Sequence, residues 1–188
     1  SYQRLGDRRG TAQAYHNLSL SFRQLGDRRE AESTAREAVR HAELVGDAGL
    51  MALVLTGQAE VEIARDELEL AAQTLERARR LARAGGDEIT GAEATRLLAR
   101  VAYARGEHAQ ALALAEEAQG VAARLGAALL EAESTAVAAL ALRALGRAGE
   151  AALRREEALA RFQRLEALEL VERFEEEWKG ASSGTTPC

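Results

Sequence analysis

Small and apolar residues return along this chain with a period of 40 positions. One alanine series is Ala31, Ala71, Ala111 and Ala151, a second is Ala38, Ala78, Ala118 and Ala158, and glycines follow the same period at Gly6, Gly46, Gly86 and Gly126. A fixed period of this length is typical of stacked repeats, because one such unit cannot bury its apolar face alone. We therefore expect an array of similar units that share one continuous core.

Each unit divides into two amphipathic helices. In the first unit the pattern predicts helices over 8–25 and 28–45, which end at Gly26 and Gly46. Glycine provides the left-handed backbone of a helix C-cap, and the aspartates that follow, Asp27 and Asp47, are suited to cap the next helix. The units are predicted at about 7–46, 47–86, 87–126 and 127–165. The turn at Asp66 is less well defined, because aspartate stands there in place of glycine.

The two ends of the array have patterns of their own. Residues 2–7 read as the end of a preceding helix that breaks at Gly6, which predicts a fragment of a longer chain. Near the other end, a single helical face carries Leu168, Val171, Phe174 and Trp178. We expect a capping helix over 166–179, the alternative being a continuation of the last repeat helix. Residues 180–188, rich in Ser, Gly and Thr, are predicted to be a disordered tail.

The first unit resembles a tetratricopeptide (TPR) repeat. With Ala12 as its first position, the family's signature positions hold Tyr15, Leu18, Ser19, Phe22, Ala31, Ala35 and Ala38. The later units keep the small residue and the two outer alanines. The 40-residue period exceeds the usual 34 and is similar to the long repeats of kinesin light chains and Leu-Gly-Asn adaptors. The resemblance implies an all-α fold, an α-solenoid of four helix pairs that winds as a right-handed superhelix and ends in the capping helix.

The resemblance also implies where a partner would bind, namely a concave groove lined by the first helix of each pair. The matching side chains are Gln13, His16, Asn17, Leu20, Arg23, Leu53, Thr56, Glu60, Ile63, Glu93, Arg96, Arg100, Tyr103, Glu133, Ala136, Leu140 and Arg143. The arginines at 96, 100 and 143 suit a carboxylate or an acidic peptide. The alternative is that they neutralise Glu93 and Glu133. The basic and amide residues with which other TPR modules clamp chaperone tails are absent from the matching positions, so we do not expect that clamp.

Composition narrows the classes of function. The 188 residues carry a net charge of −5, and Lys179 is the only lysine among many arginines. This balance disfavours nucleic acid as a partner, because phosphate binding needs a concentrated basic surface. No apolar run approaches the roughly 20 residues of a membrane span, and Cys188 stands alone. We expect a cytoplasmic protein that does not bind membranes. The abundance of Arg and Ala favours a bacterial source.

No catalytic motif accompanies the repeats. The sequence has no His-Glu-x-x-His, Gly-x-x-x-x-Gly-Lys or Gly-x-Ser-x-Gly pattern, and we expect neither an enzyme nor a cofactor. The leading hypothesis is a scaffold that binds a protein or peptide in the groove, within a larger regulatory protein. Two alternatives remain open: a sensory arm of a multidomain enzyme or transcription regulator, and a self-association module. A homodimer through the uncapped N-terminal edge belongs to the second alternative.

Overall fold

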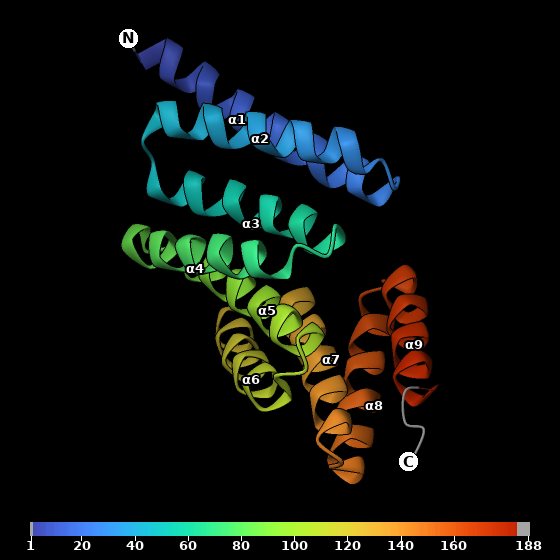
Figure 1. Ribbon diagram of the computed structural model, residues 1–188. Coiled ribbons are helices and arrows are strands. Elements are labelled where there is room, and N and C mark those ends of the chain that lie inside the picture. The colour runs from blue at the N-terminus through green and yellow to red at the C-terminus, as the bar shows by residue number, and fades with distance from the viewer. Residues whose placement is uncertain (1, 184–188) are drawn as a thin grey trace.

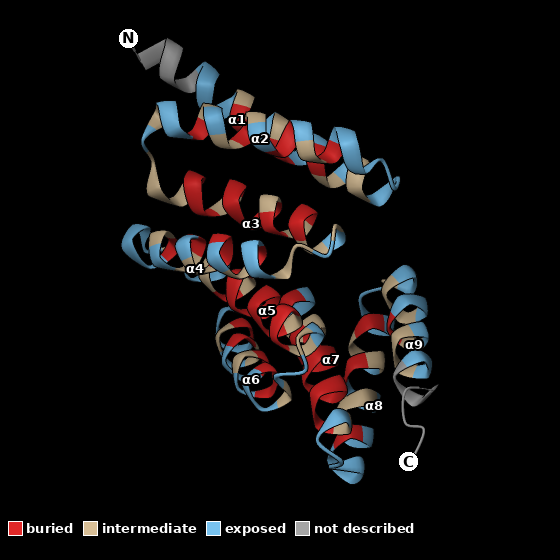
Figure 2. Ribbon diagram, in the orientation of Figure 1, coloured by how far each residue is buried: buried red, intermediate tan, exposed pale blue. Residues whose placement is uncertain are grey.

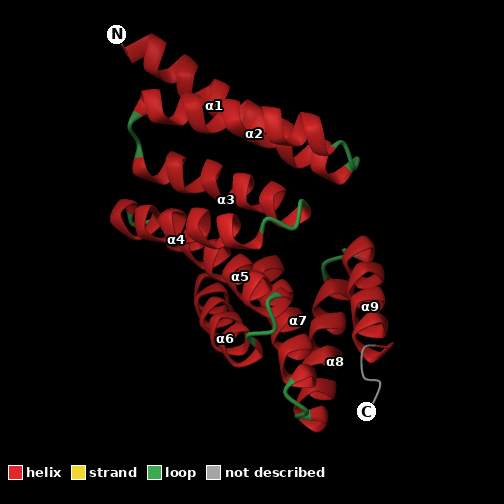
Figure 3. Cartoon of the chain, viewed as in Figure 1, coloured by secondary structure: helices red, strands yellow, loops and turns green. Residues whose placement is uncertain are grey.

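The computed structural model describes residues 2–183, with side chains described for residues 7–180. This part of the chain consists of helices joined by short turns (Figures 1 and 3). The helices are α1 (Tyr2–Gln24), α2 (Arg28–Val45), α3 (Ala48–Ala64), α4 (Leu68–Gly85), α5 (Glu88–Ala104), α6 (His108–Leu125), α7 (Ala128–Ala144), α8 (Ala148–Arg164) and α9 (Leu168–Ser183). The predicted all-α solenoid is confirmed. None of these helices combines the length and the hydropathy needed to cross a membrane.

The helices form four antiparallel pairs that stack into an arc (Figure 1). Each pair packs on the next, and the odd-numbered helices also contact one another along the stack, α1 with α3, α3 with α5, α5 with α7 and α7 with α9. Within residues 2–183 the even-numbered helices make no such contacts with one another. The odd-numbered helices therefore lie on the inner, concave side of the arc, as the sequence predicted for the first helix of each pair.

Alanine makes the close packing possible. The alanines of both 40-residue series are at most 1% exposed. A small side chain at a helix crossing lets the helix axes come close together. Larger side chains such as Leu50, Leu75 and Phe162 are also fully buried and belong to the hydrophobic core. Buried positions consequently follow the inside of the stack, and exposed positions follow the outer faces of the even-numbered helices (Figure 2).

The turns follow the predicted capping chemistry. Glycines with positive φ end the helices at six turns, among them Gly46 and Gly86, with φ of 74° and 70°. The backbone N–H of Leu50 donates to the carboxylate of Asp47 at 2.6 Å, and that of Thr90 donates to Asp87 at 3.0 Å. Asp66 and Glu166 take the same left-handed conformation, with φ of 63° and 55°. The turn at Glu166 separates α8 from α9, so a continuous final helix is not observed.

Two boundaries differ from the sequence analysis. The predicted break at Gly6 is wrong, because α1 runs without interruption from Tyr2 to Gln24. One glycine inside a helix costs only about 1 kcal/mol relative to alanine, which a helix of this length can tolerate. At the other end α9 continues to Ser183, so residues 180–183 of the predicted tail are helical. Residues 184–188 of that tail lie outside the described residues.

Candidate partner-binding groove

Two adjoining cavities lie on the concave side of the arc. The first, which we call the charged cavity, has a volume of about 270 Å³ and is lined by Arg23, Glu60, Ile63, Ala64, Arg96, Leu97, Arg100, Glu133 and Arg173. The second, the apolar cavity, has a volume of about 290 Å³ and is lined by Ile63, Arg100, Tyr103, Ala104, Val137, Leu140 and Glu177. Ile63 and Arg100 belong to both. The two cavities therefore form one continuous site that runs from α1 to α9.

Ion pairs link the helices around the charged cavity. Arg23 on α1 lies 2.8 Å from Glu60 on α3, and Arg96 on α5 lies 3.7 Å from Glu133 on α7. Glu133 also lies 3.6 Å from Arg173 on α9. Because each pair joins different helices, the chain of charges crosses the concave face from one end of the array to the other.

Arg96 is the most buried of these charges, with only 4% of its side chain exposed. Its guanidinium donates to Glu93 on the same helix, with an Nε–Oε2 distance of 3.0 Å. Burial acts to lower the pKa of Arg96, but the carboxylates of Glu93, Glu133 and Glu60 outweigh burial and raise the pKa. Arg96 therefore stays cationic, and the arrangement matches the alternative left open by the sequence, in which this arginine neutralises nearby glutamates.

Two other charges are shifted by their surroundings. Burial raises the pKa of Glu60, although the nearby Arg23 and Arg96 oppose the rise. The pKa of Arg173 is lowered by partial burial and by the like charge of Arg100, although 49% of its side chain is exposed and water therefore weakens both effects. Charges that are poorly hydrated interact more strongly with one another and with a bound group than charges in bulk water. The charged cavity is thus suited to sense the charge of what enters it.

Helix α9 closes the far end of the groove. Glu177 on α9 pairs with Arg100 on α5 at 3.0 Å. Arg143 on α7 donates to the backbone oxygen of Trp178 at 2.5 Å, and its guanidinium carbon lies 4.4 Å from the centre of the Trp178 ring. The sequence analysis missed the contributions of Arg173 and Glu177 to the groove. Their spacing of four residues, beside Phe174 and Trp178, places them on the face of α9 that packs on the array and was the available signal.

The structure brings eight of the predicted groove residues together in the two cavities: Arg23, Glu60, Ile63, Arg96, Arg100, Tyr103, Glu133 and Leu140. Others lie elsewhere. Gln13 and Asn17 are exposed on α1 and line neither cavity, and Leu20 and Leu53 are half-buried outside them. Thr56 is buried, and its hydroxyl donates to the backbone oxygen of Ala52.

His16 is buried as well, at 9% exposure, and packs on Gly57 of α3. A Cβ atom at position 57 would lie 2.5 Å from Nδ1 of His16, so only glycine leaves room for this ring. Nδ1 has no hydrogen-bond partner, and burial lowers the pKa of His16. The side chain is therefore part of the contact between α1 and α3, and it lines neither groove cavity.

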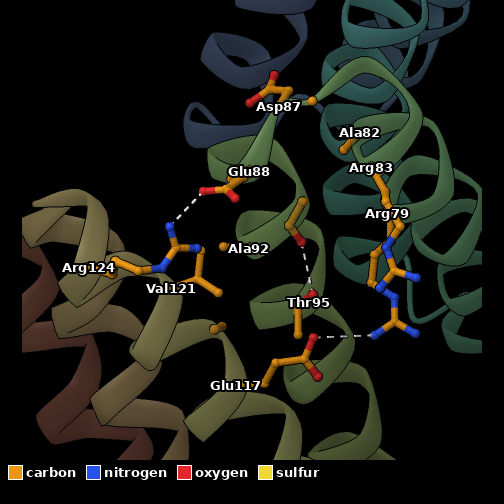
Figure 4. A pocket seen from close by; sticks show the side chains of 13 residues that line it. Arg79, Ala82, Arg83, Asp87, Glu88, Ala92, Thr95, Glu117, Val121 and Arg124 are labelled. Carbon is orange, nitrogen blue, oxygen red and sulfur yellow. Dashed lines mark hydrogen bonds and ion pairs between the residues drawn. The ribbon is translucent and has the colours of Figure 1, made fainter.

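A larger cavity, of about 380 Å³, lies between α4, α5 and α6, outside the predicted groove (Figure 4). Its floor includes Gly91 and Ala92, and position 91 corresponds by the 40-residue period to Met51 of the preceding unit. The missing side chain at Gly91 leaves the space open. Arg124 pairs with Glu88 at 2.9 Å across its rim, and Arg79 pairs with Glu117 at 3.9 Å. Its charges thus neutralise one another, and the groove remains the better candidate.

Comparison with known proteins supports the fold assignment. No family model matches the chain, and no curated protein matches it. Among solved structures, aspartyl phosphate phosphatase F from Bacillus subtilis superposes with a TM-score of 0.76 at 14% identity, over 89% of this chain and 44% of that one. A putative kinesin light chain with TPR-like repeats from Podosopora anserina superposes with a TM-score of 0.64 at 16% identity, over 91% of this chain and 94% of that one. The chain has a tetratricopeptide-repeat fold.

A third TPR structure is a signal transduction ATPase with numerous domains and a tetratricopeptide repeat sensor, from Pyrococcus horikoshii. It superposes with a TM-score of 0.70 at 16% identity, over 89% of this chain and 26% of that one. The present chain thus spans less than half the length of this protein and of the Bacillus subtilis phosphatase. At these identities the likeness concerns the TPR fold alone.

Proposed function

We propose that this chain is a protein-interaction module whose concave groove holds a peptide or a helix of a partner protein. The observation that carries the proposal is the pair of adjoining cavities on the concave face, one charged and one apolar, with Ile63 and Arg100 in common. Apolar surface gives binding energy, and charged groups beside it fix the orientation and select the partner. Helix-in-groove binding uses this combination.

The apolar cavity supplies the main attraction. It can bury one aliphatic or aromatic side chain against Ile63, Tyr103 and Leu140, and full burial of such a side chain is worth about 1.5–3 kcal/mol. We retain a protein or peptide as the partner, and a cytoplasmic bacterial regulator as the setting, as parts of the proposal.

The regulatory-arm alternative rests on a specific neighbour. The Pyrococcus horikoshii protein is described as carrying its tetratricopeptide repeat sensor within a multidomain ATPase. A groove that binds a partner would equally serve such a sensor. In either role the binding step at the groove is the same, so one experiment tests both.

The test is a selection of phage-displayed random 12-residue peptides on the purified chain. Selected peptides are then measured against Ile63→Arg, which places a charge in both cavities, and against Leu153→Arg, a matched control on α8 where the leucine is 63% exposed. Helicity by circular dichroism verifies that both variants fold.

We expect Ile63→Arg to weaken binding by about tenfold or more, since about 1.4 kcal/mol corresponds to a factor of ten. Leu153→Arg should bind as the original chain does. Peptides that bind Ile63→Arg as tightly as the original chain, or a selection that yields no binding peptide, would contradict the proposal.

A further inference from the structure

The cavity between α4, α5 and α6, which we call the α4–α6 cavity, shares no lining residue with either groove cavity. Its volume of about 380 Å³ lies within the range of about 300–1,000 Å³ in which proteins hold small molecules. Small buried residues form its floor, namely Ala82, Ala92, Thr95 and Ala118. The cavity is therefore large enough for a ligand of its own, and its wall indicates which kind.

The preceding unit fills the corresponding space with its own side chains. By the 40-residue period, Gly91 corresponds to Met51 and Thr95 corresponds to Leu55. Met51 and Leu55 are buried and pack in one hydrophobic cluster with Leu81 of α4. Methionine, with its flexible unbranched side chain, commonly fills irregular gaps of this kind. The smaller residues at 91 and 95 leave the same space unfilled.

The following unit fills the corresponding space in a second way. Gly91 corresponds there to Glu131 on α7, and Val121 corresponds to Arg161 on α8. The carboxylate of Glu131 lies 2.8 Å from the guanidinium of Arg161. Of the equivalent positions 51, 91 and 131, position 91 is thus the one that contributes no side chain to this space.

The fold does not require glycine at position 91. Gly91 lies within α5, outside the left-handed conformation that glycine favours. A Cβ atom there would lie 3.6 Å from Cβ of Ala82, which is an ordinary van der Waals contact. Glycine also weakens a helix interior by about 1 kcal/mol relative to alanine. Its effect at this position is to keep the α4–α6 cavity open.

One arginine of the cavity wall has no partner. Three arginines line the cavity, and two of them, Arg79 and Arg124, pair with glutamates. The third, Arg83, is exposed, and its guanidinium forms no hydrogen bond or ion pair with any described residue. Arg79 and Arg83 lie on one side of the opening and Arg124 on the other (Figure 4). Arg83 can therefore bind an anionic group without breaking an existing contact.

The carboxylate that balances the charge of Arg83 is engaged elsewhere. Asp87 lines the same cavity and caps α5, accepting from the backbone N–H and the hydroxyl of Thr90 at 3.0 and 2.6 Å. The N-terminus of a helix also stabilises a negative charge. The lining is thus neutral as a whole, but its one charged side chain without a partner is a cation, which favours a ligand with an anionic head.

We propose that the α4–α6 cavity binds a small aliphatic carboxylate. Its unbranched carbon chain lies over Gly91, in the space that Met51 fills in the preceding unit, and its carboxylate accepts hydrogen bonds from Arg83. The planar guanidinium of arginine matches the geometry of a carboxylate, and such charge-assisted hydrogen bonds are stronger than neutral ones. The site is independent of the concave groove.

The test titrates hexanoate into the full chain at pH 7 and follows the amide signals by NMR. We expect saturable shifts centred on Gly91 and Val121, which line the cavity from α5 and α6. 1-Hexanol keeps the carbon chain without the charge and should bind about fivefold more weakly. Acetate keeps the charge without the chain and should give no saturable shift over the same concentrations.

Substitutions at the floor test the position of the carbon chain. Gly91→Met, which installs the residue found at 51, should abolish hexanoate binding because its side chain fills the cavity. Gly10→Met makes the same change at an exposed position of α1, where a Cβ atom meets nothing within 4 Å, and should bind as the original chain does. The amide spectrum of each variant reports whether the fold is intact.

Substitutions at the wall test the position of the carboxylate. Arg83→Gln should weaken hexanoate binding about fivefold and leave 1-hexanol binding unchanged. Arg80→Gln, at a neighbouring exposed arginine of α4 that does not line the cavity, should change neither.

Four results would overturn the proposal. They are the absence of a saturable shift at the cavity, folded Gly91→Met that binds hexanoate as tightly as the original chain, and Arg83→Gln that binds it as tightly as Arg80→Gln. The fourth is loss of the shifts in Ile63→Arg, which would assign hexanoate to the groove.

Discussion

The contact between Gly57 and His16 makes a sharp prediction about a single methyl group. In Gly57→Ala the new Cβ would lie 2.5 Å from Nδ1 and 2.6 Å from Cε1 of the buried imidazole. Real Cβ atoms do not approach other atoms so closely, so either the ring of His16 or the backbones of α1 and α3 must move. The methyl group therefore acts on the packing between the first two units.

Two effects of opposite sign decide the result. Alanine favours a helix interior over glycine by about 1 kcal/mol. Overpacking a filled contact costs about 1–3 kcal/mol. We expect the second effect to win, with a net loss of about 1 kcal/mol. Gly120→Ala is the matched control, because Gly120 lies within α6 and a Cβ there meets nothing within 4 Å; it should stabilise the chain by about 1 kcal/mol.

Urea unfolding followed by circular dichroism gives the two stabilities, and amide hydrogen exchange locates the effect. Since units of a repeat array can open separately, exchange should increase in α1 for Gly57→Ala and should not increase there for Gly120→Ala. His16→Ala should lower the free energy of unfolding less in the Gly57→Ala variant than in the original chain. The difference should be about 0.5 kcal/mol or more, as for other pairs of contacting residues. Gly57→Ala that proves as stabilising as Gly120→Ala would refute the reasoning.

Three further substitutions test the turns and the buried charges. Asp66→Gly should raise the urea midpoint by an amount equivalent to about 1 kcal/mol, because Asp66 holds a positive φ that glycine adopts without strain; an unchanged midpoint would contradict this. Arg96→Ala should destabilise the chain by about 2 kcal/mol in thermal unfolding, since it leaves the half-buried carboxylates of Glu93 and Glu133 without this partner and removes a buried side chain, whereas loss of the exposed Arg124 should cost less than 1 kcal/mol. For His16, whose pKa is lowered in the folded chain, the unfolded chain takes up a proton first as the pH falls below about 6.5, so stability should decrease from pH 7 to pH 5. His16→Thr, which installs the residue found at position 56, should make that decrease in stability smaller. If stability falls equally between pH 7 and pH 5 in both proteins, His16 is not its cause.

The period and the turns were predictable because they depend on local chemistry. Glycine followed by aspartate both ends one helix and begins the next, and α2 runs from Arg28 to Val45 as the sequence predicted. The helix break predicted at Gly6 is wrong, because a glycine ends a helix only where the residues that follow it also turn away from the helix axis, and those after Gly6 stay helical. Asp66 is the opposite case. The stacking of the flanking helices imposes a turn with positive φ on an aspartate, which favours positive φ less than glycine does.

The groove was predictable only in part. The family positions identified Arg96, Arg100 and Tyr103, because side chains at fixed places on the inner helices must face the concave side. Gln13 and Asn17 are exposed and line neither cavity, whereas Arg23, farther along the same helix, lines the charged cavity. The reach of Glu177 across to α5 depends on the curvature of the whole arc, which accumulates from every unit and which no local pattern contains.

The ion pair between Arg100 and Glu177 links two inner helices across the concave face of the arc. Because the helices α5 and α9 are not in backbone contact, the ion pair bridges the open side of the arc. A partly exposed ion pair is worth about 0.2–1 kcal/mol, which is comparable with thermal energy and weakens as salt screens it. The link between α5 and α9 across the groove is therefore weak, and its contribution to holding these two helices together should decrease as salt is added.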